Sequence, residues 1–78
     1  PESVVNLSNV DFELLLYLCR NKGIALNRDI ILTRVWGYDF DGDARVVDTH
    51  IKRIRKALGR HSAQIKTISG VGYSVEEV

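Results

Sequence analysis

Cysteine, methionine and long hydrophobic runs are scarce or missing in this 78-residue sequence. Cys19 is its only cysteine, which excludes an internal disulfide framework and a cysteine-based zinc site and makes a reducing cytoplasm the simplest location. The longest apolar run, residues 14–19, is far shorter than the roughly 20 residues that span a bilayer. No basic start leads into a long apolar stretch, as it would in a signal peptide. The first residue is Pro1 rather than methionine, which fits a piece excised from a longer protein.

Length and composition indicate a single small globular domain over residues 1–78. Apolar residues make up 45% and charged residues 27%, which are ordinary proportions for a folded chain and exclude a disordered or collagen-like one. A chain of this size holds one core, with an unfolding free energy of about 4–12 kcal/mol. A large two-lobed enzyme is therefore excluded.

The net charge of +1 conceals an uneven distribution along the chain. Residues 1–43 are acidic, with seven acidic and four basic residues, whereas residues 44–67 carry seven basic residues and one acid, Asp48. Such a basic stretch indicates a polyanionic partner. The alternative is a solvated helix face without a partner.

Three helices are predicted, over residues 9–22, 28–36 and 44–58. Ser8 and Asn27 are suitable N-caps for the first two, and Gly23 and Gly59 are suitable stops for the first and the third. In the first helix, the residues expected to face the core follow i, i+3, i+4, i+7 spacing and are Phe12, Leu15, Leu16 and Cys19. Cys19 is accordingly predicted to be a small buried hydrophobe and not a reactive thiol.

The third helix is apolar on one side and basic on the other. Its predicted core stripe follows i, i+4, i+7, i+11 spacing and consists of Val47, Ile51, Ile54 and Leu58. Residues 64–68 and 73–75 read as the strands of a hairpin turning at residues 70–72, and residues 3–7 favour a strand before the first helix. An inner face that docks on a core and an outer basic face suit a helix lying in the DNA major groove. The sequence therefore predicts an α+β winged helix-turn-helix, with a three-helix core and a C-terminal hairpin wing.

Four segments carry a resemblance to a known family: residues 28–32, 35–38, 45–58 and 65–73. In this order and with these gaps they resemble the OmpR/PhoB family, the DNA-binding output domains of two-component response regulators. The resemblance runs from about Leu7 to Val75. It implies sequence-specific binding to double-stranded DNA and control of transcription, with residues 44–58 as the recognition helix. The wing, residues 64–75, would contact adjacent backbone or the minor groove.

The resemblance also assigns site residues by position. Those that would approach base edges are Val46, Asp48, Thr49 and Arg53. Those that would hold phosphates are Trp36, Arg45, His50, Lys52, Arg55, Thr67 and Tyr73. The loop that would contact RNA polymerase, within residues 37–44, consists of Tyr38, Asp39, Phe40, Asp41, Gly42 and Asp43.

Further implications concern partners. Family members bind direct-repeat DNA sites as head-to-tail dimers, and phosphorylation of a separate receiver domain switches them.

The sequence departs from the family pattern at two places. The family's N-terminal antiparallel sheet is largely missing, so that apolar surface of the first helix is left uncovered, and Ser69 stands where many members carry a wing arginine. The resemblance implies no enzyme activity, no cofactor, no metal and no membrane, and it implies a cytoplasmic location.

Several residues permit a second interpretation. Arg53 suits base reading because an arginine can bond a guanine at two points, whereas Asp48 could instead orient Arg45 or Lys52 through i−3 and i+4 pairs. His50 could simply cover the helix, and Tyr73 could pack against the core.

Asp39, Asp41 and Asp43 alternate as in a calcium loop, but Gly42 is at the fourth position instead of the sixth and His50 stands at the twelfth. We therefore predict no metal site. Gly70-Val71-Gly72 is a hairpin turn without a nucleotide-binding continuation. A protein-interaction module using the loop or the exposed side of the first helix is the alternative function.

Overall fold

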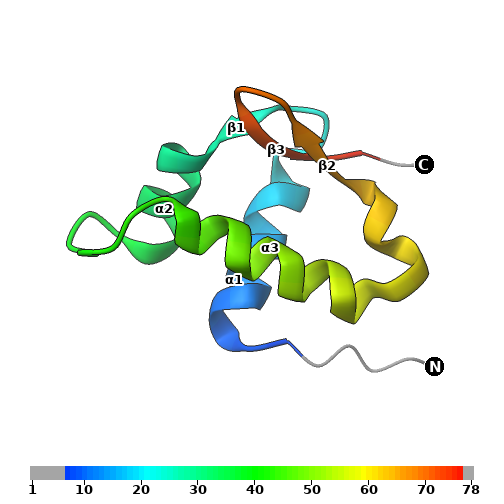
Figure 1. The fold of residues 1–78 in the computed structure, drawn as a ribbon, viewed down its shortest axis with the longest axis horizontal. Helices are drawn as coiled ribbons and strands as arrows, with labels where there is room; N and C mark the ends of the chain where they lie inside the picture. The colour runs from blue at the N-terminus through cyan, green and yellow to red at the C-terminus, as the bar shows by residue number, and fades with distance from the viewer. Residues whose placement is uncertain (1–6, 77–78) are drawn as a thin grey trace.

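The computed structural model describes residues 7–76, which form three α-helices, a 3₁₀ segment and a small antiparallel sheet (Figure 1). In chain order the elements are α1 (Asn9–Arg20), β1 (Leu26–Asn27), α2 (Arg28–Trp36), α3 (Arg45–Leu58), η1 (Gly59–Gln64), β2 (Ile65–Ile68) and β3 (Gly72–Val75). This order confirms the predicted α+β winged helix-turn-helix. The strand predicted over residues 3–7 lies outside the described residues except for Leu7, which is in no strand. No helix of the described range 7–76 has the length and apolar character needed to cross a membrane.

Side chains cap the first two helices as predicted. Ser8 Oγ accepts a hydrogen bond from the Asp11 N–H at 3.2 Å, and Asn27 Oδ1 accepts one from the Ile30 N–H at 2.8 Å. α1 ends at Arg20, two residues before the predicted position. Asn21 ends the helix because its side-chain amide donates to the carbonyl of Tyr17 at 2.9 Å, and Gly23 then turns the chain at a φ of 84°.

The core-facing side of α1 differs from the prediction. Leu14 and Leu18 are fully buried, whereas Phe12 is 55% exposed and Cys19 is exposed. The prediction that Phe12 and Cys19 face the core is therefore wrong. α1 carries eight apolar residues distributed around most of the helix, so the spacing alone does not define one face. α2 and α3 pack on the side that carries Leu14 and Leu18.

The core stripe of α3 is confirmed, with Val47, Ile51 and Ile54 buried and Leu58 half-buried against them. Most of the outer side of the helix is left open (Figure 1). The long, basic third helix therefore lies on the surface with its apolar side inward.

The wing hairpin belongs to a three-stranded sheet with the strand order β1-β3-β2. The sequence did not predict β1, whose two residues pair with β3 in the register Leu26 to Tyr73 and Asn27 to Gly72. β2 pairs with the other side of β3 over four residue pairs. β1 immediately precedes α2, so the sheet ties the wing to the start of the helix-turn-helix.

Candidate nucleic-acid interface

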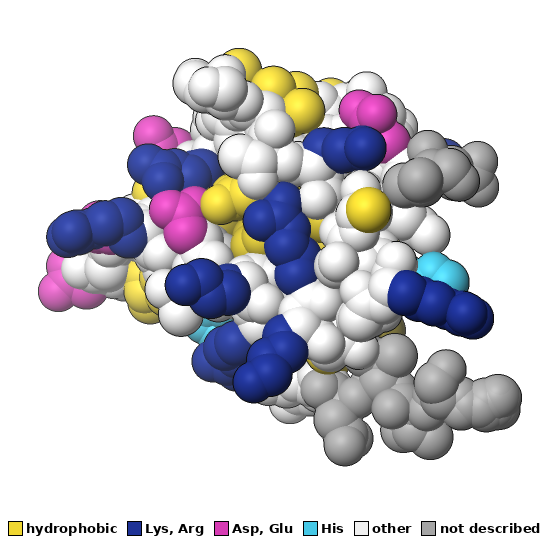
Figure 2. Space-filling view, turned by 45° about the vertical axis from the view of Figure 1, so that its right-hand side comes forward, with side chains coloured by type: hydrophobic (Ala, Val, Ile, Leu, Met, Phe, Trp, Pro, Cys, Tyr) yellow, Lys and Arg dark blue, Asp and Glu magenta, His cyan; other side chains and the backbone are white. Residues whose placement is uncertain are grey.

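Basic side chains gather on the open side of α3. Its exposed positions are Arg45, Thr49, Lys52, Arg53, Lys56 and Ala57. The space-filling view shows Lys and Arg side chains spread across this side of the molecule (Figure 2). A helix with an apolar inner face and a cationic outer face is suited to rest against a polyanion such as a nucleic acid backbone.

One flank of α3 is bound to the wing through Arg55. Its Nη2 donates to the carbonyl oxygen of Ile65 at 2.9 Å and to Thr67 Oγ1 at 2.8 Å, both on β2. The guanidinium also lies over the ring of Tyr73, 5.8 Å from its centroid. Arg55 and Thr67 are thus brought together, and the wing is fixed relative to the helix.

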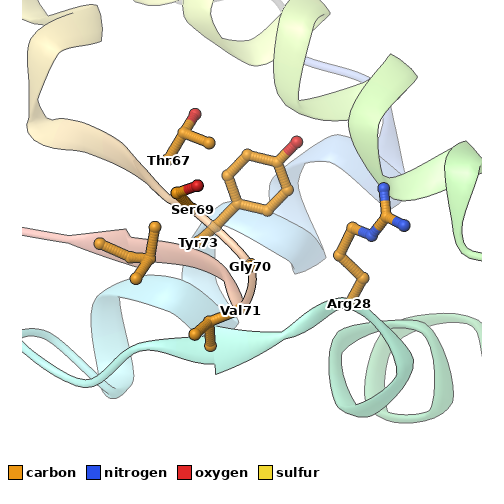
Figure 3. Close-up of a pocket in the computed structure, with 8 residues that line it drawn as sticks. Arg28, Thr67, Ser69, Gly70, Val71 and Tyr73 are labelled. Carbon is orange, nitrogen blue, oxygen red and sulfur yellow. The ribbon is translucent and has the colours of Figure 1, made fainter.

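Asp48 on the same flank joins three elements. Its Oδ2 lies 2.6 Å from Arg28 Nη1 at the start of α2, and its Oδ1 accepts a hydrogen bond from the Tyr73 hydroxyl on β3 at 2.6 Å. Figure 3 shows the Arg28 guanidinium and the Tyr73 ring both directed toward α3. Both residues, together with the wing turn, line a cleft of about 450 Å³. Asp48 does not pair with Arg45 or Lys52 but with a residue from another helix.

The environment of Tyr73 gives a pH-dependent prediction. Burial, together with the hydrogen bond to Asp48, raises the pKa of Tyr73 from 10.0 to about 12. Because the folded state holds this proton more tightly than the unfolded chain, the associated stabilisation is present below pH 10 and is lost as the pH rises toward 12. Tyr73→Phe should remove this part of the alkaline loss of stability, measured by urea unfolding from pH 9 to 12.

The matched control is Tyr38→Phe, since Tyr38 is 92% exposed. We expect this variant to follow the pH profile of the unmodified protein. A Tyr73→Phe profile parallel to that of Tyr38→Phe would contradict the assignment.

The opposite flank of α3 faces α1 and α2. The His50 ring is half-buried, lies edge-on to Trp36 with ring centroids 5.2 Å apart, and places its Nδ1 2.5 Å from Asp11 Oδ1. Arg53 Nη2 lies 3.2 Å from the other oxygen of Asp11. His50 and Arg53, both predicted to contact DNA, therefore share one carboxylate partner.

The loop between α2 and α3 is open and acidic. Tyr38 projects into solvent, and Asp39 and Asp41 are exposed, whereas Phe40 lies 6.0 Å from the Trp36 ring, centroid to centroid. The last acid of the loop, Asp43, pairs with Arg45 at 2.9 Å, and this side-chain hydrogen bond lowers the pKa of Asp43 and raises that of Arg45. The N-terminal end of α3 is therefore partly neutralised within the chain itself.

The remaining predicted positions lie on or beside α3. Val46 is half-buried against the core, and Thr49 is exposed, with its hydroxyl 3.4 Å from the carbonyl of Arg45. The structure thus gathers the predicted base-contacting and phosphate-contacting residues around one helix and the adjacent wing. Among residues 7–76, no three His, Cys, Asp or Glu side chains are grouped so as to hold a metal ion.

Two residues that organise this surface, Asp11 and Arg28, were not singled out as site residues by the sequence. The signal for Asp11 was present: it shares a helix face with Leu14 and Leu18 at i+3 and i+7, which places a charge in line with a buried stripe. For Arg28 no comparable pattern exists, because its partner is 20 residues away on α3.

Comparison with known proteins gives a family match over most of the chain. The family described as "Transcriptional regulatory protein, C terminal" matches residues 2–75. The alkaline phosphatase synthesis transcriptional regulatory protein PhoP of Bacillus subtilis is 49% identical over 79 residues, and the match covers 97% of this chain. The chain spans 33% of the length of that relative.

Two solved structures share the fold. The DNA-binding domain of Bacillus subtilis CssR superposes with a TM-score of 0.82 at 36% identity, covering 94% of this chain and 81% of that one. The DNA-binding domain of Klebsiella pneumoniae RstA, in complex with the RstA box, has a TM-score of 0.78 at 36% identity, with 92% and 74% covered. The latter was solved bound to DNA.

Proposed function

The chain belongs to the OmpR/PhoB family of transcriptional regulatory C-terminal domains, and we propose that it binds double-stranded DNA sequence-specifically as the output domain of a two-component response regulator. This family is one of transcriptional regulators and not of enzymes. In this role, residues 1–78 act as a single domain, with α3 in the major groove and the wing on adjacent backbone or in the minor groove. The observation that best supports this proposal is the exposed basic face of α3, whose opposite face packs into the core.

Residue roles follow from exposure and existing contacts. Thr49 and Arg53 are exposed on α3 and are proposed, with Val46, to read base edges. Asp48 has both oxygens engaged by Arg28 and Tyr73, which supports a role in holding the wing against the helix in place of its predicted base contact. The proposed phosphate contacts remain Trp36, Arg45, His50, Lys52, Arg55, Thr67 and Tyr73.

Partners beyond the DNA are proposed on the same basis. The exposed acidic loop, with Tyr38 at its tip, suits a contact with RNA polymerase, because an exposed aromatic ring is typical of protein recognition and the exposed acids Asp39 and Asp41 would favour a basic partner surface. Head-to-tail dimers on direct repeats and a receiver domain elsewhere in a longer protein complete the proposal. The receiver is consistent with the chain spanning 33% of the Bacillus subtilis relative. A cytoplasmic location is proposed with this function, because a transcriptional regulator acts where the DNA lies.

The test is a selection from random duplexes, followed by fluorescence anisotropy on the enriched sequence at several salt concentrations. We expect an enriched direct repeat bound about 10³-fold or more tightly than random duplex. If about five cations contact phosphates, log K falls against log salt with a slope of about −4 to −5, because each contact releases a counterion. Lys52→Ala should reduce this slope by about one on every sequence alike.

Two outcomes would contradict the proposal. Salt-dependent binding without an enriched duplex sequence would show electrostatic attraction to DNA but no sequence specificity. Folded protein that binds no duplex would favour the alternative, a protein-interaction module that uses the acidic loop.

A further inference from the structure

Asp11 is a buried carboxylate at the first turn of α1. It is 3% exposed and lies in line with the fully buried Leu14 and Leu18. A carboxylate at such a position is costly unless it is paired and hydrogen-bonded. The side chains that pair with Asp11 therefore indicate its role in the structure.

Both partners of Asp11 come from α3. Its Oδ1 contacts His50 Nδ1 at 2.5 Å, and its Oδ2 contacts Arg53 Nη2 at 3.2 Å. His50 and Arg53 are three residues apart, so they stand one turn apart on the same flank of the helix. One carboxylate of α1 thus fixes two side chains of the proposed recognition helix.

Arg53 remains available to a ligand although it is anchored. Its side chain is 54% exposed, and within residues 7–76 the contact to Asp11 occupies Nη2 alone. A guanidinium has five N–H donors, and two suffice to bond a guanine edge. An arginine held at one point loses less conformational freedom on binding than a free one, which favours discrimination between bases.

We propose that Asp11 is a positioning residue for DNA recognition, which holds Arg53 in the orientation that reads a base and orients the His50 ring beside it. This proposal rests on the proposed DNA-binding function. Pairing the buried carboxylate with a half-exposed arginine contributes little net stability compared with apolar packing, so the geometry that the pair imposes is its main consequence. Asp11 does not touch the DNA itself but acts through Arg53.

The first experiment compares Asp11→Asn with the unmodified protein on the selected duplex and on duplexes with each base pair replaced. We expect Asp11→Asn to lose about tenfold in discrimination at the base pair that Arg53 reads. Binding to random duplex should change by less than about twofold, because the exposed cations of α3 are retained. The control is Asp29→Asn, the exposed first-turn acid of α2, which should leave both quantities unchanged.

A variant cycle separates positioning from general structural damage. If Asp11 acts through Arg53, Asp11→Asn should cause no further loss of discrimination in an Arg53→Ala background. Independent losses that multiply in the double variant would overturn the proposal, as would unchanged discrimination in Asp11→Asn. If the unmodified protein itself discriminates between no sequences, the proposed function fails instead, and the two failures are therefore distinguishable.

A measurement on the unmodified protein covers the case in which Asp11→Asn does not fold. The NMR order parameter of the Arg53 Nε–H bond should exceed that of Arg34, which makes no ion pair within the described residues. Equal mobility of the two side chains would overturn the proposal.

Discussion

Gly72→Ala is expected to detach the wing from the helices and to lower the free energy of unfolding by about 3 kcal/mol or more. A Cβ atom at this position would overlap the carbonyl oxygen of Leu26 and lie 3.0 Å from the Asn27 Cα. Both obstacles are backbone atoms of β1, which pairs with β3 at this point, so neither can move without breaking the strand pairing. Urea unfolding followed by Trp36 fluorescence measures the loss.

Gly42→Ala is the matched control for this variant. Its added Cβ would meet only the ring of Phe40, at 2.5 Å, and this ring belongs to an exposed loop where it can rotate away. We expect a change of less than about 0.5 kcal/mol. Equal unfolding midpoints for the two glycine variants would contradict the account of Gly72.

Ile54→Ala is expected to destabilise the protein by about 2–5 kcal/mol. Ile54 is fully buried on the inner face of α3 and belongs to the hydrophobic core cluster. Removing three carbons leaves a cavity that the surrounding core only partly fills. For a protein of this size the loss is a large part of a total of about 4–12 kcal/mol, so the melting temperature should fall strongly in circular dichroism.

Ile30→Ala serves as the control, since Ile30 is 44% exposed on α2. The same atoms are removed, but little packing is lost, and the expected change is below about 1 kcal/mol. Comparable destabilisation by the two substitutions would show that the core is not centred on α3.

Local signals were sufficient to predict most of the fold. The boundaries of α2 were predicted correctly because Asn27 caps its start and Gly37 follows its end. The core stripe of α3 was predicted because its large apolar residues recur at i, i+4, i+7 and i+11 along one face. α1 lacks such a contrast, and the neighbours that choose its buried side are distant in sequence.

The contacts within the candidate site were less predictable for the same reason. Asp48 was predicted to contact a base edge, with a pair to Arg45 or Lys52 in its own helix as the alternative, but its partners are Arg28 and Tyr73, which lie 20 and 25 residues away in sequence. Likewise β1 has only two residues, too few to show the alternation typical of a strand, and it forms because β3 passes beside it. Spacing within one element carries no information about such partners.

The short strands of the wing sheet have a consequence for behaviour at high concentration. An exposed sheet edge is a template on which other chains can add strands and aggregate. Here one edge is the two-residue β1, and on the other edge the guanidinium of Arg55 already occupies the Ile65 carbonyl of β2. The edges of this sheet therefore give a foreign strand little backbone to pair with, and the wing is protected against strand-mediated aggregation.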